Sequence, residues 1–310
     1  MTRRMVQRGV FLLLAAAVLT GAARVPSHTA EPSGSADTVY VYDGYAAKTD
    51  AAFDAASLDR AAYRFQHLYD LYFTGRTVYL AVVPDKALFT VPPAGYTPAG
   101  AAETADYLRD ALDFLTPVDI AAGLTLADYY RTDPHWRQER LRPAADALLT
   151  AMGAPVSGTR DETLCALEGD FHGSYWGKTE EPLEPDTLAY LTSPVLDSCT
   201  VHSYETDTDG GVYDFAAAQD APYDLFLSGS RSLLRIDSPQ ALSDRTLVVF
   251  RDSFGSSLIP LLAESYRTVY AVDIRYLSSD LLGRFVDFPA DADVLLLYST
   301  TVLHNSITLK

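Results

Sequence analysis

The chain has 310 residues, of which 24 are Lys or Arg and 41 are Asp or Glu, and its formal net charge at neutral pH is −17. A surface this acidic repels nucleic acids and anionic lipids, which argues against both as partners. The length suits one large α/β domain with a substantial core.

The N-terminal segment predicts export. Three arginines among the first eight residues precede an apolar run from Val10 to Leu19, and Gly-Ala-Ala follows as a cleavage site. We therefore expect residues 1–23 to be a signal peptide and the protein to be secreted or held in the cell envelope. An uncleaved membrane anchor is the alternative, although a spanning helix needs about 20 apolar residues. Residues 24–37, rich in Pro and Ser, are expected to form a flexible leader.

Strand and helix signals alternate from residue 38 onward. Thr38 to Tyr42 and Thr77 to Val83 predict strands. Apolar residues recur at helical spacing in two places and predict two helices: Ala61, Phe65, Leu68 and Tyr72, then Leu108, Leu112 and Leu115 before Pro117. A third helical stripe contains Ala144, Ala145, Leu148 and Leu149.

The second half continues this rhythm after an interruption. Residues 152–215 show no clear period and predict a long insertion or loop-rich flap. Three apolar runs then predict buried strands: Leu247 to Phe250, Thr268 to Val272 and Val294 to Tyr298. A helix through Leu258, Leu261 and Leu262 follows the first of them. This alternation predicts an α/β fold, with a mostly parallel sheet, helices on both faces and one domain over residues 38–310.

Two cysteines, Cys165 and Cys199, lie in the expected domain. In an oxidising compartment the pair would form one disulfide, so we predict that they lie close enough to bridge. Two buried thiols are the alternative. The six histidines fall at no ligand-like spacing with one another or with the cysteines, so neither a metal site nor a cofactor is predicted.

A serine stands where open α/β sheets bind their ligands. The strand at 247–250 runs into Arg-Asp-Ser-Phe-Gly-Ser-Ser and then into a helix, which places Ser253 on a strand-to-helix turn. The helix N-terminus there offers unpaired N–H groups to a developing oxyanion. The alternative is that Asp252 or Ser253 serves only as a helix cap.

A second segment carries an acid and a base. Asp133 and His135 are separated only by Pro134, whose ring stiffens the turn. At this spacing the carboxylate can reach the imidazole Nδ1–H and leave Nε2 free to take a proton from a serine. The alternative is an ordinary helix start with Asp133 as its cap.

Together the two segments resemble a known family. Thr-Asp-Pro-His-Trp at 132–136 and Asp-Ser-Phe-Gly-Ser-Ser-Leu at 252–258 are similar to motifs of the DHHW family and the alginate O-acetyltransferases of the SGNH superfamily. Val-Val-Pro-Asp-Lys at 82–86, Phe-Leu-Ser-Gly-Ser at 226–230 and Val-Asp-Ile-Arg-Tyr at 272–276 also look like segments of that branch. Pro134 replaces the first histidine of the DHHW signature.

The resemblance implies a fold and a set of site residues. The fold would be an SGNH-hydrolase-like three-layer sandwich with a circularly permuted motif order. Ser253 would be the nucleophile, His135 the general base and Asp133 the residue that orients it. The oxyanion hole would draw on the amides of Ser253 and Gly229, and Ser230 stands where the family has an asparagine as a further donor.

The implied function is O-acetyl transfer to an envelope or secreted polysaccharide. A polysaccharide or other sugar would be the acceptor, and a membrane protein is a candidate acyl donor. A carbohydrate esterase or deacetylase on the same triad is one alternative. A non-catalytic polysaccharide-binding or envelope-assembly protein on the same scaffold is another.

Three other groups receive simpler interpretations. Trp136 is expected to pack beneath the histidine loop. Arg275 is expected to form a buried ion pair with Asp273 or Asp252. The aromatic segment at 171–176 could be a sugar platform, but an ordinary packed loop is the expected structure.

Overall fold

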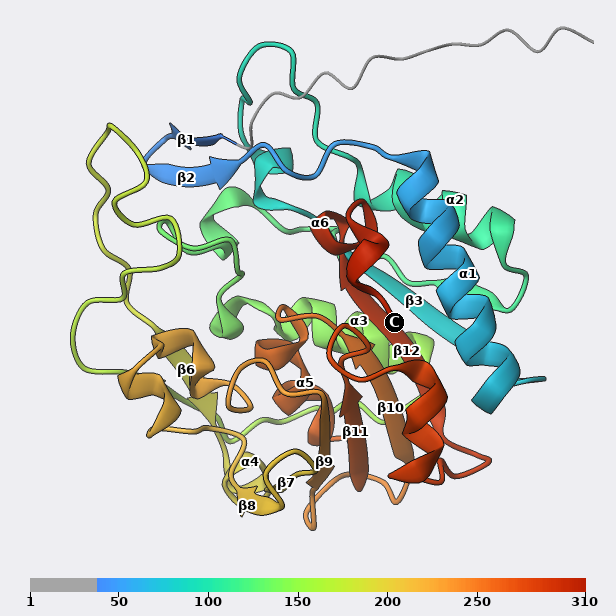
Figure 1. Ribbon diagram of the computed structural model, residues 1–310. Coiled ribbons are helices and arrows are strands. Elements are labelled where there is room, and N and C mark those ends of the chain that lie inside the picture. Colours follow the sequence, from blue (N-terminus) through green and yellow to red (C-terminus); the bar gives the residue numbers. More distant parts are fainter. Residues whose placement is uncertain (1–37) are drawn as a thin grey trace, which may run out of the picture. The chain divides into compact units, whose positions relative to one another are not determined.

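The structure is a computed structural model and describes residues 38–310, so the predicted signal peptide and leader lie outside the described residues. Its centre is an eight-stranded sheet in the order β4-β3-β12-β10-β11-β9-β7-β8 (Figure 1). Five adjacent strands are parallel: β4 (Leu115–Pro117), β3 (Val78–Val83), β12 (Asp293–Ser299), β10 (Thr246–Arg251) and β11 (Thr268–Val272). Three antiparallel strands extend one edge: β9 (Leu233–Asp237), β7 (Thr200–Ser203) and β8 (Thr208–Gly210).

Helices cover both faces of the sheet. The longer ones are α1 (Ala55–Tyr72), α2 (Ala101–Ala111), α3 (Arg142–Ala151) and α5 (Gly255–Ala263), and α4 (Pro194–Asp197) and α6 (Thr300–Leu303) are single turns. Short 3-10 turns are η1 (Lys86–Phe89), η2 (Leu126–Asp128), η3 (Gln138–Arg140), η4 (Ala217–Gln219), η5 (Pro222–Leu225), η6 (Ser279–Arg284) and η7 (Ser306–Thr308). Two hairpins lie outside the main sheet, β1 (Val39–Tyr42) with β2 (Tyr45–Lys48) and β5 (Thr163–Ala166) with β6 (Ala189–Thr192).

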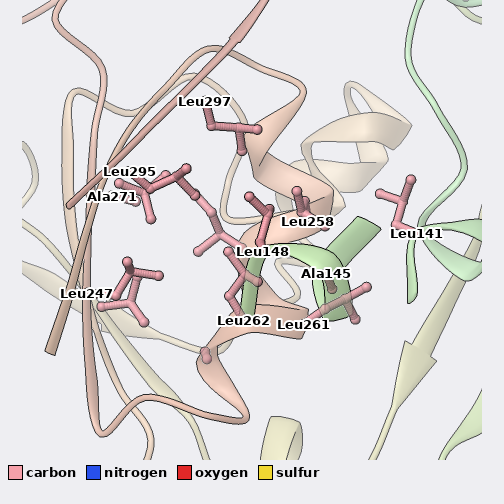
Figure 2. Close-up of a cluster of buried hydrophobic side chains, with 14 of the residues drawn as sticks. Leu141, Ala145, Leu148, Leu247, Leu258, Leu261, Leu262, Ala271, Leu295 and Leu297 are labelled. Carbon is pink, nitrogen blue, oxygen red and sulfur yellow. The ribbon is translucent and has the colours of Figure 1, made fainter. Parts of the chain in front are cut away.

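Side-chain alternation along β10 divides the core into two layers. Leu247 and Val249 join the cluster made with α3 and α5, whereas Val248 and Phe250 join the cluster made with α1 and α2. Figure 2 shows the first layer, in which leucines of α3 and α5 pack against Leu247, Leu295 and Leu297 of the sheet. The predicted three-layer α/β arrangement with a mostly parallel sheet is therefore confirmed.

The topology gives the end of β10 the position at which open α/β sheets bind their ligands. The chain passes from β10 to β11 through α5 on one face, and from β11 to β12 past η6, whose Leu282 packs in the other layer. The two connections therefore lie on opposite faces of the sheet. The loop that begins at Asp252 follows β10, the strand between β11 and β12. Such a switch point opens a crevice at the carboxyl edge of a sheet.

The strand predicted at 38–42 is present as β1, which forms a separate hairpin with β2. Two other sequence predictions need correction. The second predicted helix ends at Ala111, and Leu115 begins β4 because it pairs with Val78 there. Residues 152–215 are not a flap throughout, since β7 and β8 extend the main sheet. These strands have only four and three residues, too few for a detectable period.

No helix among residues 38–310 is long and apolar enough to cross a bilayer.

Candidate active site

The three predicted triad residues meet at the carboxyl edge of the sheet. The Ser253 Oγ lies 2.8 Å from the His135 Nε2, although the two residues are 118 positions apart. The His135 Nδ1 lies 2.5 Å from the Asp133 Oδ1. Since a carboxylate only accepts hydrogen bonds, Nδ1 carries the proton of the imidazole and Nε2 is free to accept from the serine hydroxyl. This geometry matches the arrangement expected from the sequence.

The alternative that these residues serve only as helix caps does not describe the serine turn or the Asp133–His135 loop. The residue that caps α5 is Phe254, without a side-chain cap bond, so Ser253 is not the helix cap. No helix starts at Asp133, because α3 begins only at Arg142. Asp252 is buried and its carboxylate accepts from the amides of Phe254 at 3.0 Å and Ser299 at 2.7 Å, which ties the serine turn to the end of β12.

Asp133 is held as a carboxylate. Its Oδ1 also accepts from the His135 amide at 3.1 Å, and its Oδ2 accepts from the Ser174 amide at 2.8 Å. Burial by itself raises the pKa of Asp133, but its electrostatic interaction with His135 and these hydrogen bonds outweigh burial and lower the pKa to about 2. The group is therefore ionised at neutral pH.

Residues 171–186 clamp the loop that carries Asp133 and His135. Asp186 is buried, and its carboxylate accepts from the Arg131 amide, the Thr132 amide and the Thr132 hydroxyl at 2.7–2.8 Å. Gly173 lies directly against the loop, because a Cβ added there would be 2.3 Å from the Asp133 Cβ. Sequence reasoning missed these contacts, and the only available signal was a glycine inside an aromatic segment.

Lys86 supports the same loop from the sheet side. It is 1% exposed, and its ammonium donates to the carbonyl oxygens of Tyr130 and Asp133 at 2.8 Å each. The ammonium also lies 5.3 Å from the centre of the Tyr175 ring. Burial lowers the pKa of Lys86 to about 8, although Asp133 and two other carboxylates partly oppose this effect. Sequence reasoning placed Lys86 in a family-like segment without giving it a role.

The imidazole is held between two aromatic rings. Tyr223 stacks on His135 with a centroid distance of 3.9 Å and an interplanar angle of 14°, and Phe254 lies 4.7 Å away. The Tyr223 hydroxyl and the Ser257 hydroxyl are 3.0 Å apart. Trp136 is wholly buried and donates to the Phe254 carbonyl at 3.1 Å, so the packing role expected for it is confirmed.

The expected oxyanion donors differ in availability. Among residues 38–310, the Ser253 amide donates to no acceptor, so it is free. The Gly229 amide donates to the Phe226 carbonyl at 3.1 Å and thereby closes a turn. Leu227 and Ser228 within that turn adopt left-handed φ values of 54° and 56°, which are uncommon for residues with a Cβ. Ser230 is exposed, and its role as a donor remains a prediction.

The remaining predictions divide between confirmed and wrong. Arg275 forms the expected buried ion pair, with its Nη2 2.6 Å from the Asp273 Oδ2. In the aromatic segment, Phe171 and Tyr175 are buried as in a packed loop, while Trp176 is 39% exposed.

The predicted disulfide is wrong. Both cysteines are free: Cys165 lies on the β5–β6 hairpin, and Cys199 is buried in the main core, where its thiol donates to the Val195 carbonyl. Cys165 is part of the two-stranded β5–β6 sheet, whereas Cys199 lies between α4 and β7, outside any strand. Within residues 38–310 no group of acidic, His or Cys side chains could hold a metal ion.

Comparison with known proteins gives structural matches only. No protein-family model and no curated protein sequence matches the chain. A DHHW family protein from Eubacterium siraeum superposes with a TM-score of 0.67 at 22% identity, covering 88% of this chain and 96% of that one. PatB1 from Bacillus cereus gives a TM-score of 0.65 at 18% identity, covering 86% and 97%. The O-acetyltransferase domain of Pseudomonas putida AlgJ gives 0.50 at 16% identity, covering 87% and 93%. The resemblance to the DHHW branch seen in the sequence motifs is thus confirmed at the level of the fold.

Proposed function

We propose that the protein is a serine-dependent O-acyltransferase that moves an acetyl group to a hydroxyl of an envelope or secreted polysaccharide. The observation that carries the proposal is the hydrogen-bonded series from Ser253 through His135 to the ionised Asp133. A serine alcohol is a weak nucleophile until an adjacent base accepts its proton, and this arrangement supplies that base with its orienting carboxylate.

The first half-reaction loads the serine. The His135 Nε2 takes the hydroxyl proton while the Ser253 Oγ bonds to the acyl carbon and the carbonyl electron pair moves onto oxygen. When the tetrahedral intermediate collapses, the carbonyl re-forms, the bond to the leaving oxygen breaks and His135 returns the proton to that oxygen. The product is an acetyl ester on Ser253.

The second half-reaction repeats these steps with the acceptor. A sugar hydroxyl gives its proton to His135 and attacks the acetyl carbon, and the intermediate releases Ser253 with its proton restored. Water in place of the sugar would make the same residues an esterase. The name of the AlgJ domain, an O-acetyltransferase, supports transfer over hydrolysis, and export remains part of the proposal.

The acyl-enzyme is the species to detect. The protein that consists of residues 24–310 should release acetate from a chromogenic acetyl ester. Its mass should increase by one acetyl group, and peptide mapping should place that group on Ser253. Ser253→Ala should lower kcat by on the order of 10³-fold or more, and His135→Ala should lower it about equally, because the two act as one unit. Ser278→Ala, in the loop after β11, serves as a matched serine control and should keep wild-type turnover.

The acceptor decides between transfer and hydrolysis. Adding an oligosaccharide should divert acetyl from water to sugar, which mass spectrometry of the sugar would show. Acetate release without sugar modification across several acceptors would reassign the protein as an esterase. Wild-type rates in Ser253→Ala, with no adduct on the wild-type protein, would exclude catalysis by this triad and favour a non-catalytic binding or assembly role.

Bacillus cereus PatB1 has also been solved with a sulfonyl adduct, which suggests a second probe. A sulfonyl fluoride should add its sulfonyl group to Ser253 with loss of fluoride, and His135→Ala should slow that labelling. This readout requires neither the natural donor nor the acceptor.

A further inference from the structure

The peptide group between Gly229 and Ser230 is joined to the serine turn through Arg251, and its carbonyl oxygen is already hydrogen-bonded. The Gly229 amide donates to Phe226, and its carbonyl oxygen accepts from the Arg251 Nη2 and the Arg231 amide at 3.1 Å each. Both polar groups of Gly229 are therefore used within the protein. Its amide is not free to meet a new charge unless the turn at 226–229 opens.

Within the described part of the chain, the amide of Ser230, the next residue along, is free to donate a hydrogen bond. Residues 38–310 contain no cis peptide bond, and in a planar trans peptide the N–H of Ser230 points opposite to the C=O of Gly229. That carbonyl is directed at the Arg251 guanidinium, which is wholly buried. The Ser230 N–H is consequently directed away from the interior. Ser230 is exposed, and its amide meets no acceptor within residues 38–310.

Arg251 joins this peptide to the nucleophile. It stands two positions before Ser253, and its Nη1 donates to the Ser256 hydroxyl at 2.9 Å and to the Asp252 carbonyl at 3.4 Å. On its other side Gly229 lies directly against Asp224, because a Cβ there would lie 2.2 Å from the Asp224 Oδ1.

The position of Arg251 is determined by the surrounding fold. Among residues 38–310, no carboxylate lies within salt-bridge distance of its guanidinium, so its hydrogen-bond partners are carbonyl oxygens and the Ser256 hydroxyl. Gly255 leaves space for it, because a Cβ at Gly255 would be 2.8 Å from the Arg251 Cβ. A buried cation bonded to fixed peptide groups holds them in one orientation, because releasing them would leave the charge without partners.

We propose that the backbone N–H of Ser230, together with that of Ser253, donates to the oxyanion, and that Arg251 is the positioning residue that aims the Ser230 amide. The proposal rests on the acyl-transfer function proposed above. It replaces the Gly229 amide expected from the sequence with the next amide in the chain. It also gives Ser230 a role that does not depend on its side chain.

The chemistry requires a donor of this kind. As the Ser253 Oγ bonds to the acyl carbon, the carbonyl electron pair becomes a negative charge on oxygen, and a preorganised N–H group stabilises that charge more than it stabilises the neutral carbonyl. Losing one such donor costs about 10²–10³ in kcat. KM changes much less, because the charge is absent from bound substrate.

The decisive experiment removes single N–H groups by replacing an amide with an ester. Lactic acid at position 230 is compared with Ser230→Ala, which differs from it only in keeping the amide. Glycolic acid at position 229 is compared with wild type. The ester at 230 should lower kcat with the chromogenic acetyl ester by about 10²-fold or more and leave KM within about threefold. The ester at 229 should lower thermal stability and cost kcat at least tenfold less than the ester at 230.

Two results would overturn the assignment: unchanged kcat for the ester at 230, or a larger kcat loss for the ester at 229. Failure of the acyl-transfer function is recognised separately, because Ser253→Ala would then keep its activity in the same assay.

The role of Arg251 is tested by non-additivity. Arg251→Lys should lower kcat by about tenfold or more. The further loss of kcat on placing the ester at 230 should be much smaller in the Arg251→Lys background than the loss measured between the ester at 230 and Ser230→Ala. If the two losses multiply independently, Arg251 does not act through the Ser230 amide. Urea unfolding of each protein confirms that a folded enzyme is compared, and the ester pair tests the donor even if Arg251→Lys is too unstable to assay.

Discussion

Lys86→Met removes the ammonium that the Asp133–His135 loop surrounds with carbonyl oxygens. Methionine has a similar length but donates no hydrogen bond, so the Tyr130 and Asp133 carbonyls, each 2.8 Å from the lysine nitrogen, lose their donor. An unsatisfied buried acceptor costs about 1–3 kcal/mol, which gives about 2–6 kcal/mol for the pair. The substitution also removes a buried charge. The pKa of Lys86 falls from 10.5 to about 8, which means that keeping this charge in the folded protein costs about 3 kcal/mol at neutral pH. Lys86→Met removes this cost and is stabilised by the same amount.

These opposing effects predict a small change in stability and a large activity loss. The net effect on stability should lie between a gain of about 1 kcal/mol and a loss of about 3 kcal/mol, whereas a displacement of the loop near 1 Å should lower kcat about 10²-fold. Urea unfolding measures the first quantity and turnover of the chromogenic ester the second. Lys178→Met, at an exposed lysine, is the matched control and should change neither. Wild-type kcat in folded Lys86→Met would refute the reasoning.

The same lysine predicts a pH dependence of stability. Below about pH 8 the group is charged in both the folded and the unfolded chain, so the cost of burying the charge is fully present. Between about pH 8 and pH 10.5 the folded chain has lost this proton and the unfolded chain keeps it, so stability from Lys86 rises with pH. The wild type should therefore gain stability relative to Lys86→Met across this window. A constant difference between the two unfolding curves would contradict the burial effect.

Three further changes test the surroundings of the imidazole. Gly173→Ala should lower kcat at least about tenfold, since its Cβ would meet the Asp133 Cβ at 2.3 Å, whereas Gly210→Ala adds a Cβ into open space and should be neutral. Tyr223→Leu should lower kcat about tenfold because the ring stacked on His135 is lost, and Tyr223→Phe should retain most of it. Stability from Asp133, whose pKa is depressed to about 2, should be present above about pH 4 and be lost as the pH falls toward 2, and Asp133→Asn should flatten that part of the acid unfolding curve.

The sequence by itself determined the parts of the site that depend on near neighbours. The apolar run at 247–250, followed directly by a serine and a helical stripe, defines a strand-to-helix turn within a dozen residues. The Asp-Pro-His spacing likewise places a carboxylate and an imidazole within reach of each other through one stiff turn. Local spacing is sufficient for such features because few backbone angles separate the groups concerned. The alternation of short apolar runs with helical stripes was enough to predict the layers of the fold.

Only the tertiary structure decided which distant groups hold these parts in place. Lys86, Asp186 and Arg251 act on carbonyls or amides far along the chain, and a contact between a side chain and a remote peptide group leaves no period or spacing in a sequence. Strand membership was decided in the same way, since β7 belongs to the main sheet only because β9 lies beside it. The availability of an amide is likewise a tertiary property. The glycine at 229 matches the family pattern, but its N–H is already bonded across a turn, and the buried Arg251 aims the next amide outward.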